Sequence, residues 1–85
     1  MSRAMRKSAR MVRGKPDPAL GAAIRQARED AGLTQAQLAV RADLAIGTLT
    51  RLESGTTDPS WSSVRALAEA LGLSMTALAR LAEGG

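Results

Sequence analysis

Signals that start and stop helices alternate along the chain from Asp17 onward, and they restrict it to a small helical fold. A residue that can cap a helix N-terminus precedes most apolar segments, and a glycine follows several of them. The first helix begins with Asp17 as cap and Pro18 at the first helical position, where a missing N–H costs nothing, and Gly32 ends it. No stretch alternates apolar and polar residues as a half-buried strand does. The sequence therefore predicts an all-α domain.

Four further helices follow from the same signals. The second helix is expected from a capping box at 34–37 to about Ala42, and the third over 45–53 before Gly55. The fourth is expected from a cap at Asp58 or Ser60 to Leu71, before Gly72. The fifth is expected from a cap at Ser74 onward. A chain of 85 residues makes one domain of this kind. Such a domain buries only about 60% of the surface that its unfolded chain exposes, which argues against a large active-site cleft.

The composition excludes several classes of function. The chain has no cysteine and no histidine, so it lacks thiolate ligands, the commonest zinc ligand and the commonest general base. It also lacks a glycine loop for phosphate, and we expect no enzyme, no cofactor, no metal site and no small-molecule sensor. No apolar run approaches the roughly 18 residues of a membrane span, and no signal peptide is recognisable. We therefore expect a cytoplasmic protein without a membrane partner.

Charge is distributed unevenly along the chain. Residues 1–16 contain six Lys or Arg and no acid, whereas residues 17–85 contain six Arg and all eight acids. The first segment lacks apolar periodicity and ends in Gly14 and Pro16, which predicts a flexible basic arm before a domain spanning 17–85. Basic arms bind polyanions, and nucleic acid is the expected ligand. The alternative is a solvated N-terminus without a ligand, with translation starting at Met5 or Met11.

Several short motifs resemble those of the phage repressor and Cro-type (XRE-type) helix-turn-helix family. They are AGLTQ at 31–35, Leu38-Ala39, Leu49, Leu52-Glu53, Gly55, Pro59 and LAEALGL at 67–73. The resemblance covers about three quarters of the chain. It implies a compact five-helix domain with a reading unit at about 34–54, which binds double-stranded DNA with its third helix in the major groove.

The third helix presents one face that suits DNA. If successive residues turn by about 100°, positions 47, 50, 51 and 54 share a face opposite the core. The resemblance assigns base contacts to Ile46, Gly47, Thr48, Thr50 and Arg51. Arg51 is the only long donor among them and can pair with guanine O6 and N7. Ile46 packs either on a thymine methyl group or on its own domain, Gly47 permits close approach of the backbone, and Thr50 is either a contact or simply solvated.

Contacts to DNA phosphates are expected around this face. The resemblance places Thr34 and Gln35 at the start of the second helix, where backbone N–H groups meet phosphate, although their capping role would hold without DNA. Hydroxyl contacts are expected from Ser54, Thr56 and Thr57. That loop contains no Lys or Arg, where the family often has one, so most phosphate affinity is expected from the arm. The arm's cations are Arg3, Arg6, Lys7, Arg10, Arg13 and Lys15.

Other residues have structural assignments. Arg28 and Glu53 occupy positions where the family often has a partly buried ion pair that ties the first helix to the end of the third. Ala39 is the small residue at the crossing of the second and third helices. Asp43 occupies a turn position where the family usually has a left-handed glycine. Trp61 is expected to pack in the core rather than stack on bases.

Dimerisation is implied because one such domain touches few base pairs. The resemblance implies a two-fold homodimer on a pseudo-palindromic operator. The dimerisation region is expected at about 70–83, with Met75, Leu78 and Leu81 at the interface, although Leu73 and Leu78 are also expected to close the core. The leading function is a transcriptional regulator, most simply a repressor. The alternative is an antitoxin that binds DNA and a partner toxin through the arm or the last helix.

Overall fold

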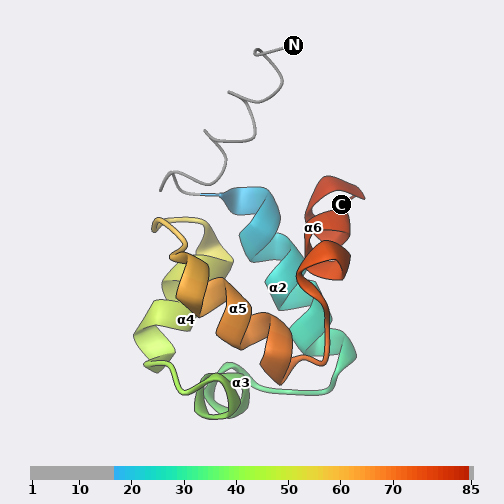
Figure 1. Ribbon diagram of the computed structural model, residues 1–85. Helices are drawn as coiled ribbons and strands as arrows, with labels where there is room; N and C mark the ends of the chain where they lie inside the picture. The colour runs from blue at the N-terminus through green and yellow to red at the C-terminus, as the bar shows by residue number, and fades with distance from the viewer. Residues whose placement is uncertain (1–16, 85) are drawn as a thin grey trace.

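The computed structural model describes residues 17–84 and contains five helices (Figure 1). They are α2 (Pro18–Asp30), α3 (Gln35–Ala42), α4 (Ile46–Ser54), α5 (Trp61–Ala70) and α6 (Met75–Gly84). The all-α, five-helix fold predicted from the sequence is therefore confirmed. The third predicted helix is displaced by one residue, because α4 starts at Ile46 and ends at Ser54.

Side-chain caps fix the starts of four helices. Asp17, Thr34, Ser60 and Ser74 each accept a hydrogen bond, 3.0 to 3.1 Å long, from a backbone N–H in the first turn of the next helix. Thr34 forms the full predicted capping box, and Ser60 is the cap of α5. Helix α4 is the exception, because Ala45 has no side chain that can accept such a bond. Its start must be fixed by packing instead.

Two left-handed residues end the helices of the reading unit. Asp43 ends α3 with φ 56° and Gly55 ends α4 with φ 72°. Gly55 also lies against the start of α2, where a Cβ would be 2.9 Å from the Cα atom of Pro18. A side chain is therefore excluded there both by the backbone conformation and by the contact. Pro18 is thus held beside the end of α4.

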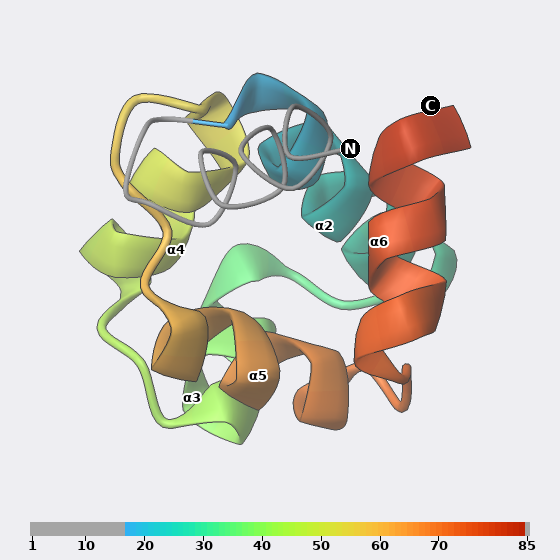
Figure 2. The ribbon, with the colours of Figure 1, turned by 45° about the horizontal axis from the view of Figure 1, so that its top comes forward.

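Helix α2 is the centre of the domain. It packs against both α4 and α6, which lie on opposite sides of it, while α5 packs against α3 (Figures 1 and 2). The core lies between these helices, and its fully buried large side chains are Ile24, Leu38, Leu49, Leu67 and Leu78. Helices α3 and α4 also contact each other, and Ala39 of α3 is buried, at 3% exposed.

The contact between α2 and α4 depends on Gly21. A Cβ at this position would overlap the carbonyl oxygen of Leu52 and lie 2.9 Å from that of Glu53. The absence of a side chain lets the two helix backbones meet directly. Nothing in the local sequence around Gly21 indicates this, because the contact joins residues more than 30 positions apart.

Two expectations about apolar residues are corrected. Trp61 is 58% exposed, so it is not a core residue. It is the first residue of α5, where less of the domain surrounds it than surrounds the middle of that helix. Leu78 is 1% exposed and belongs to the core. Its side chain is therefore not available to a dimer interface, and that expectation is wrong.

Candidate nucleic-acid interface

One face of α4 is open to solvent. The opposite face enters the core through Leu49 and Leu52, which places the remaining side chains outward. Ile46, Thr50, Arg51 and Ser54 are exposed, and Gly47 and Thr48 are half-buried beside them. Ile46 is 50% exposed, so it is not enclosed by its own domain. The residues predicted to contact bases therefore share one continuous surface.

The guanidinium of Arg51 lies along α4 toward the start of the helix. Its Nη1 atom is 3.5 Å from the position that a Cβ on Gly47 would occupy. None of the ion pairs formed within residues 17–84 includes Arg51. As far as the described residues go, its donors are available to an external acceptor.

A buried ion pair holds α4 against α2. Arg28 Nε donates to Glu53 Oε2 at 2.7 Å and Arg28 Nη2 donates to Glu53 Oε1 at 3.1 Å, which is a bidentate arrangement. The side chains are 12% and 3% exposed. Arg28 Nη1 also donates to the carbonyl oxygen of Leu33 at 2.8 Å. The hydrogen bond with Glu53 raises the pKa of Arg28 above its ordinary value, although burial acts in the opposite direction, so this arginine stays charged.

Gln35 connects this ion pair to the exposed face. Its Nε2 atom donates to Glu53 Oε1 at 2.9 Å, and its Oε1 atom accepts from Thr50 Oγ1 at 3.2 Å. The Thr50 hydroxyl also lies 2.9 Å from the carbonyl oxygen of Ile46. Gln35 thus fixes the start of α3 relative to α4. This role was not predicted, because its partners lie 15 and 18 residues away in the sequence.

The loop after α4 uses its hydroxyl groups internally. Ser54 Oγ donates to the carbonyl oxygen of Arg51 at 3.1 Å, and Thr56 Oγ1 approaches the same oxygen at 3.4 Å. Ser54 and Thr56 are also 2.9 Å apart through their hydroxyls. The same carbonyl oxygen also accepts the backbone N–H of Thr56 at 3.1 Å, so these hydroxyls add to bonds that already end the helix. Thr57 is half-buried in the same loop.

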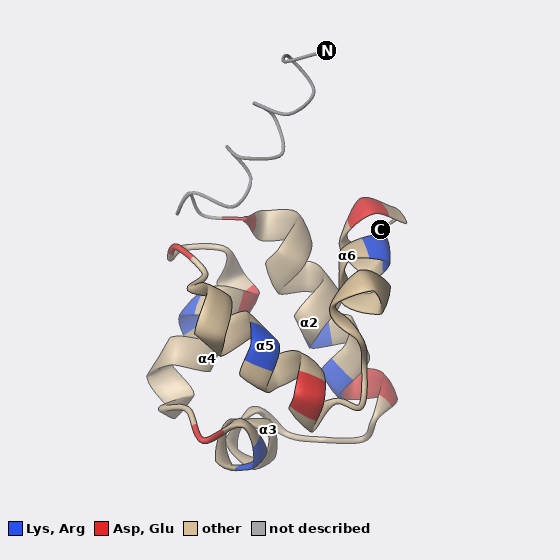
Figure 3. Ribbon diagram, viewed as in Figure 1, with Lys and Arg blue, Asp and Glu red and all other residues tan. Residues whose placement is uncertain are grey.

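The charge around this face is poorly suited to DNA on its own. Acidic residues occupy the turns before and after α4, at Asp43 and Asp58 (Figure 3). The described residues contain six Arg against eight acids. The predicted basic arm, residues 1–16, lies outside the described residues. The chain enters the described part at Asp17, beside Pro18, which packs against Gly55 at the end of α4.

Other kinds of site find no support in the described part. No group of three or more carboxylates in residues 17–84 is placed to hold a metal ion. Within the same residues, no helix combines the length and the apolar character needed to cross a membrane.

Comparisons with known proteins agree with this geometry. Residues 19–81 match the family described as "Helix-turn-helix domain". Two crystal structures of the clp gene regulator ClgR from Corynebacterium glutamicum are 35% identical and cover 80% of this chain. Their TM-scores are 0.76 and 0.77, over 87% and 72% of those chains. No curated protein matches the chain.

A second similar structure is the restriction-modification controller protein C.AhdI from Aeromonas hydrophila. It is 27% identical, with a TM-score of 0.69 over 82% of this chain and 97% of that chain. The family match covers well over half of the chain, and the ClgR structures exceed 30% identity over most of it. The chain therefore belongs to the helix-turn-helix domain family, of the XRE type, a family of DNA-binding transcription regulators.

Proposed function

We propose that the protein regulates transcription by reading a specific double-stranded DNA sequence, as a homodimer on a pseudo-palindromic operator. The observation that carries this proposal is the exposed face of α4, with the Arg51 donors unpaired among the described residues. The names of two similar proteins support it, since ClgR is a gene regulator and C.AhdI a restriction-modification controller. Repression is the simplest form, because a dimer on an operator blocks access to it.

Base reading is assigned to the α4 face. Arg51 pairs with guanine O6 and N7, a contact worth about 1 to 3 kcal/mol of discrimination. Ile46 offers its exposed side chain to a thymine methyl group, the apolar feature of the major groove. Gly47 brings the backbone close to the bases, and Thr48 and Thr50 flank these contacts.

Phosphate contacts are assigned to three places. The first is the N-terminus of α3, at Thr34 and Gln35, where first-turn backbone N–H groups have no acceptor within the helix. The second is the set of loop hydroxyls of Ser54, Thr56 and Thr57. A phosphate would compete with the Arg51 carbonyl oxygen for the hydroxyls of Ser54 and Thr56. The third, and the largest, is the arm.

The arm contributes through counterion release. Its cations are Arg3, Arg6, Lys7, Arg10, Arg13 and Lys15. Engaging four of them would add about 3.6 to the slope of log affinity against log salt concentration, at about 0.9 per phosphate. The start of the described chain beside the end of α4 gives the arm access to the same stretch of duplex.

Dimerisation is assigned to α6. Leu81 is 43% exposed and carries this assignment, whereas Met75 is half-buried and lines a groove between α2, α5 and α6. Sedimentation of Leu81→Glu tests this: we expect a monomer where the natural protein is a dimer. Val40→Glu is the matched control, since Val40 is 80% exposed on α3, away from α6. Equal sedimentation of both variants and the natural protein would contradict the assignment.

The decisive experiment for this function is selection of bound sequences from a pool of randomised duplex DNA at about 150 mM salt, where non-specific binding is weakened. The natural protein is expected to enrich two half-sites about one helical turn apart. Arg51→Ala is expected to lose a guanine preference of roughly 5- to 150-fold in each half-site, from the 1 to 3 kcal/mol of one bidentate contact. Arg65→Ala, which removes an exposed arginine from α5, serves as the control.

Two results would overturn the proposal. If the natural protein enriches no sequence, α4 does not read bases. If Arg51→Ala enriches the same consensus as Arg65→Ala, another residue supplies the specificity.

A further inference from the structure

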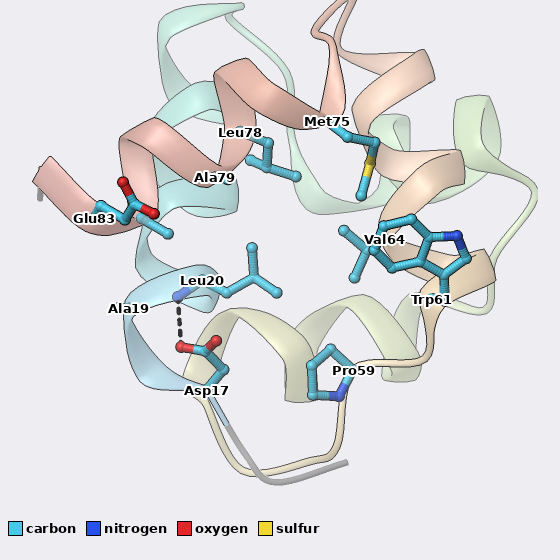
Figure 4. Close-up of a pocket in the computed structure, with 11 residues that line it drawn as sticks. Asp17, Ala19, Leu20, Pro59, Trp61, Val64, Met75, Leu78, Ala79 and Glu83 are labelled. Carbon is cyan, nitrogen blue, oxygen red and sulfur yellow. Dashed lines mark hydrogen bonds between the residues drawn. The ribbon is translucent and has the colours of Figure 1, made fainter. Parts of the chain in front are cut away.

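An apolar groove of about 310 Å³ opens between the start of α2, the start of α5 and α6 (Figure 4). Its apolar lining includes Leu20, Pro59, Trp61, Val64, Met75 and Leu78. Trp61 lies beside Val64 and Met75 at one end, and more than half of the Trp61 side chain is exposed. An exposed large aromatic side chain in an apolar hollow is characteristic of a surface that binds something.

The charge of the groove is one-sided. Among the described residues that line it, the charged ones are Asp17 and Glu83, and both are acidic. Both lie at the end away from Trp61 (Figure 4). Asp17 uses one carboxylate oxygen to cap α2, through Leu20 N at 3.0 Å, and a carboxylate has further lone pairs for a cation. The groove therefore suits a ligand with an apolar part and, next to it, a basic part.

We propose that residues 11–16 of this chain occupy the groove when the protein is free, with Met11 and Val12 on its apolar part. Arg13 and Lys15 then lie beside its acidic end. The segment contains this order of residues, apolar pair first and cations second, and it contains no acid. The complementarity is thus both chemical and directional.

Chain connectivity gives the segment the right direction. Pro16 is bonded to Asp17, which itself lines the acidic end of the groove. From Pro16 back toward Met11, the cations come first and the apolar pair comes last. From Asp17 along the groove, the acidic end comes first and Trp61 comes last, so the two orders match. Six residues reach at most about 20 Å when extended, so Met11 can reach well beyond Asp17.

Tethering favours this occupant over a second molecule. A segment joined by a short linker has an effective concentration in the millimolar range. A second copy of the chain in a dilute solution is present at far lower concentration. The groove is therefore expected to be filled within one chain, independently of protein concentration.

Docking has a consequence for DNA binding, which rests on the function proposed above. Arg13 and Lys15 cannot hold the groove carboxylates and DNA phosphates at the same time. DNA is expected to draw the segment out of the groove and expose Trp61. Docking itself does not depend on that function, because it is tested without DNA.

Trp61 makes the test simple, because it is the only aromatic residue of the chain. Acrylamide quenching of its fluorescence is compared in the full-length protein and in the double variant Met11→Ser with Val12→Ser. If the segment covers half of the exposed indole surface, the variant is expected to be quenched roughly twice as strongly. Its emission is also expected to move to longer wavelength. Circular dichroism verifies that each variant keeps its helices.

The matched control is Val40→Ser with Ile46→Ser. It replaces two exposed apolar residues that do not line the groove, so quenching is expected to stay at the natural value. Raising the salt to about 1 M shortens the screening length to about 3 Å, which weakens the attraction between the cations and the groove carboxylates. Quenching is therefore expected to increase in the natural protein and the control. It is expected to stay unchanged in the Met11 and Val12 variant.

Two results would overturn the proposal. Equal quenching of the natural protein and the Met11 and Val12 variant means that the segment does not cover Trp61. Quenching that falls as protein concentration rises, in both proteins, means that a second copy fills the groove. DNA binding is measured separately, so failure of docking and failure of the proposed function are distinguishable.

Discussion

Replacing Gly21 with alanine tests how α4 is positioned, because this glycine is where α2 and α4 meet. The added Cβ would overlap the Leu52 carbonyl oxygen and lie 2.9 Å from the Glu53 carbonyl oxygen. Both obstacles are backbone atoms of α4, so no side-chain rotation relieves the contact. The two helices must separate, or the alanine must be accommodated with strain.

The magnitude follows from two opposing effects. Overpacking in a close-packed interior costs about 1 to 3 kcal/mol. Alanine in a helix is favoured over glycine by up to about 1 kcal/mol, which offsets part of that cost. We expect a net loss of about 1 to 2 kcal/mol, which lowers the Tm of a domain of this size by roughly 5 to 15 °C.

The assay is thermal unfolding followed by circular dichroism, with Gly47→Ala as the matched control. Within residues 17–84, a Cβ at Gly47 meets only Arg51 Nη1, at an ordinary 3.5 Å. This variant changes the same residue type in the first turn of another helix, and we expect its Tm to stay the same or rise slightly. If Gly21→Ala is as stable as Gly47→Ala, the account of the contact between α2 and α4 is wrong.

Two further predictions concern the reading unit. Arg28→Met leaves Glu53 buried without its partner, so urea unfolding is expected to show a loss of about 3 kcal/mol or more, whereas Arg25→Met breaks an exposed pair worth at most about 1 kcal/mol. Equal losses in the two variants would show that burial does not decide the effect. Asp43→Gly relieves a left-handed backbone and is expected to raise stability by up to about 1 kcal/mol, while Asp43→Val is expected to lower it. The reverse order in unfolding experiments would contradict the assigned backbone conformation.

The features that could be predicted from the sequence are local ones. The caps at Asp17, Thr34 and Ser74 depend on residues three positions apart, so a short window of sequence contains both partners. The outward face of α4 follows from helical periodicity alone. The left-handed turn at Asp43 was expected from the family resemblance, and aspartate tolerates this conformation better than most residues.

The features that escaped prediction depend on distant packing. Gln35 was predicted as a phosphate contact, and the additional role of its amide, which joins Glu53 to Thr50 across two helices, was not predicted. Gly21 looked like any residue in a helix until α4 was placed against it. Trp61 was wrongly assigned to the core because large apolar side chains are normally buried. Helices α2, α5 and α6 instead leave a groove beside it.

The charge distribution separates sequence specificity from non-specific affinity. The described domain carries more acid than base, and its exposed reading face contains a single arginine between two acidic turns. We infer that specificity resides in α4 and that most non-specific affinity resides in residues 1–16. Regulation of DNA binding through the groove would then act on affinity without altering the sequence that is read.

We infer that α4 and the start of α3 form the surface that contacts DNA. The most direct test is a titration of the isotope-labelled protein with its selected duplex, followed by amide NMR shifts. We predict that the largest shifts cluster at residues 34–36 and 46–57. Amide signals of α6 should shift less than these. Amide signals near Trp61 should shift only when residues 11–16 leave the groove. Largest shifts along α6, with α4 unchanged, would contradict the account.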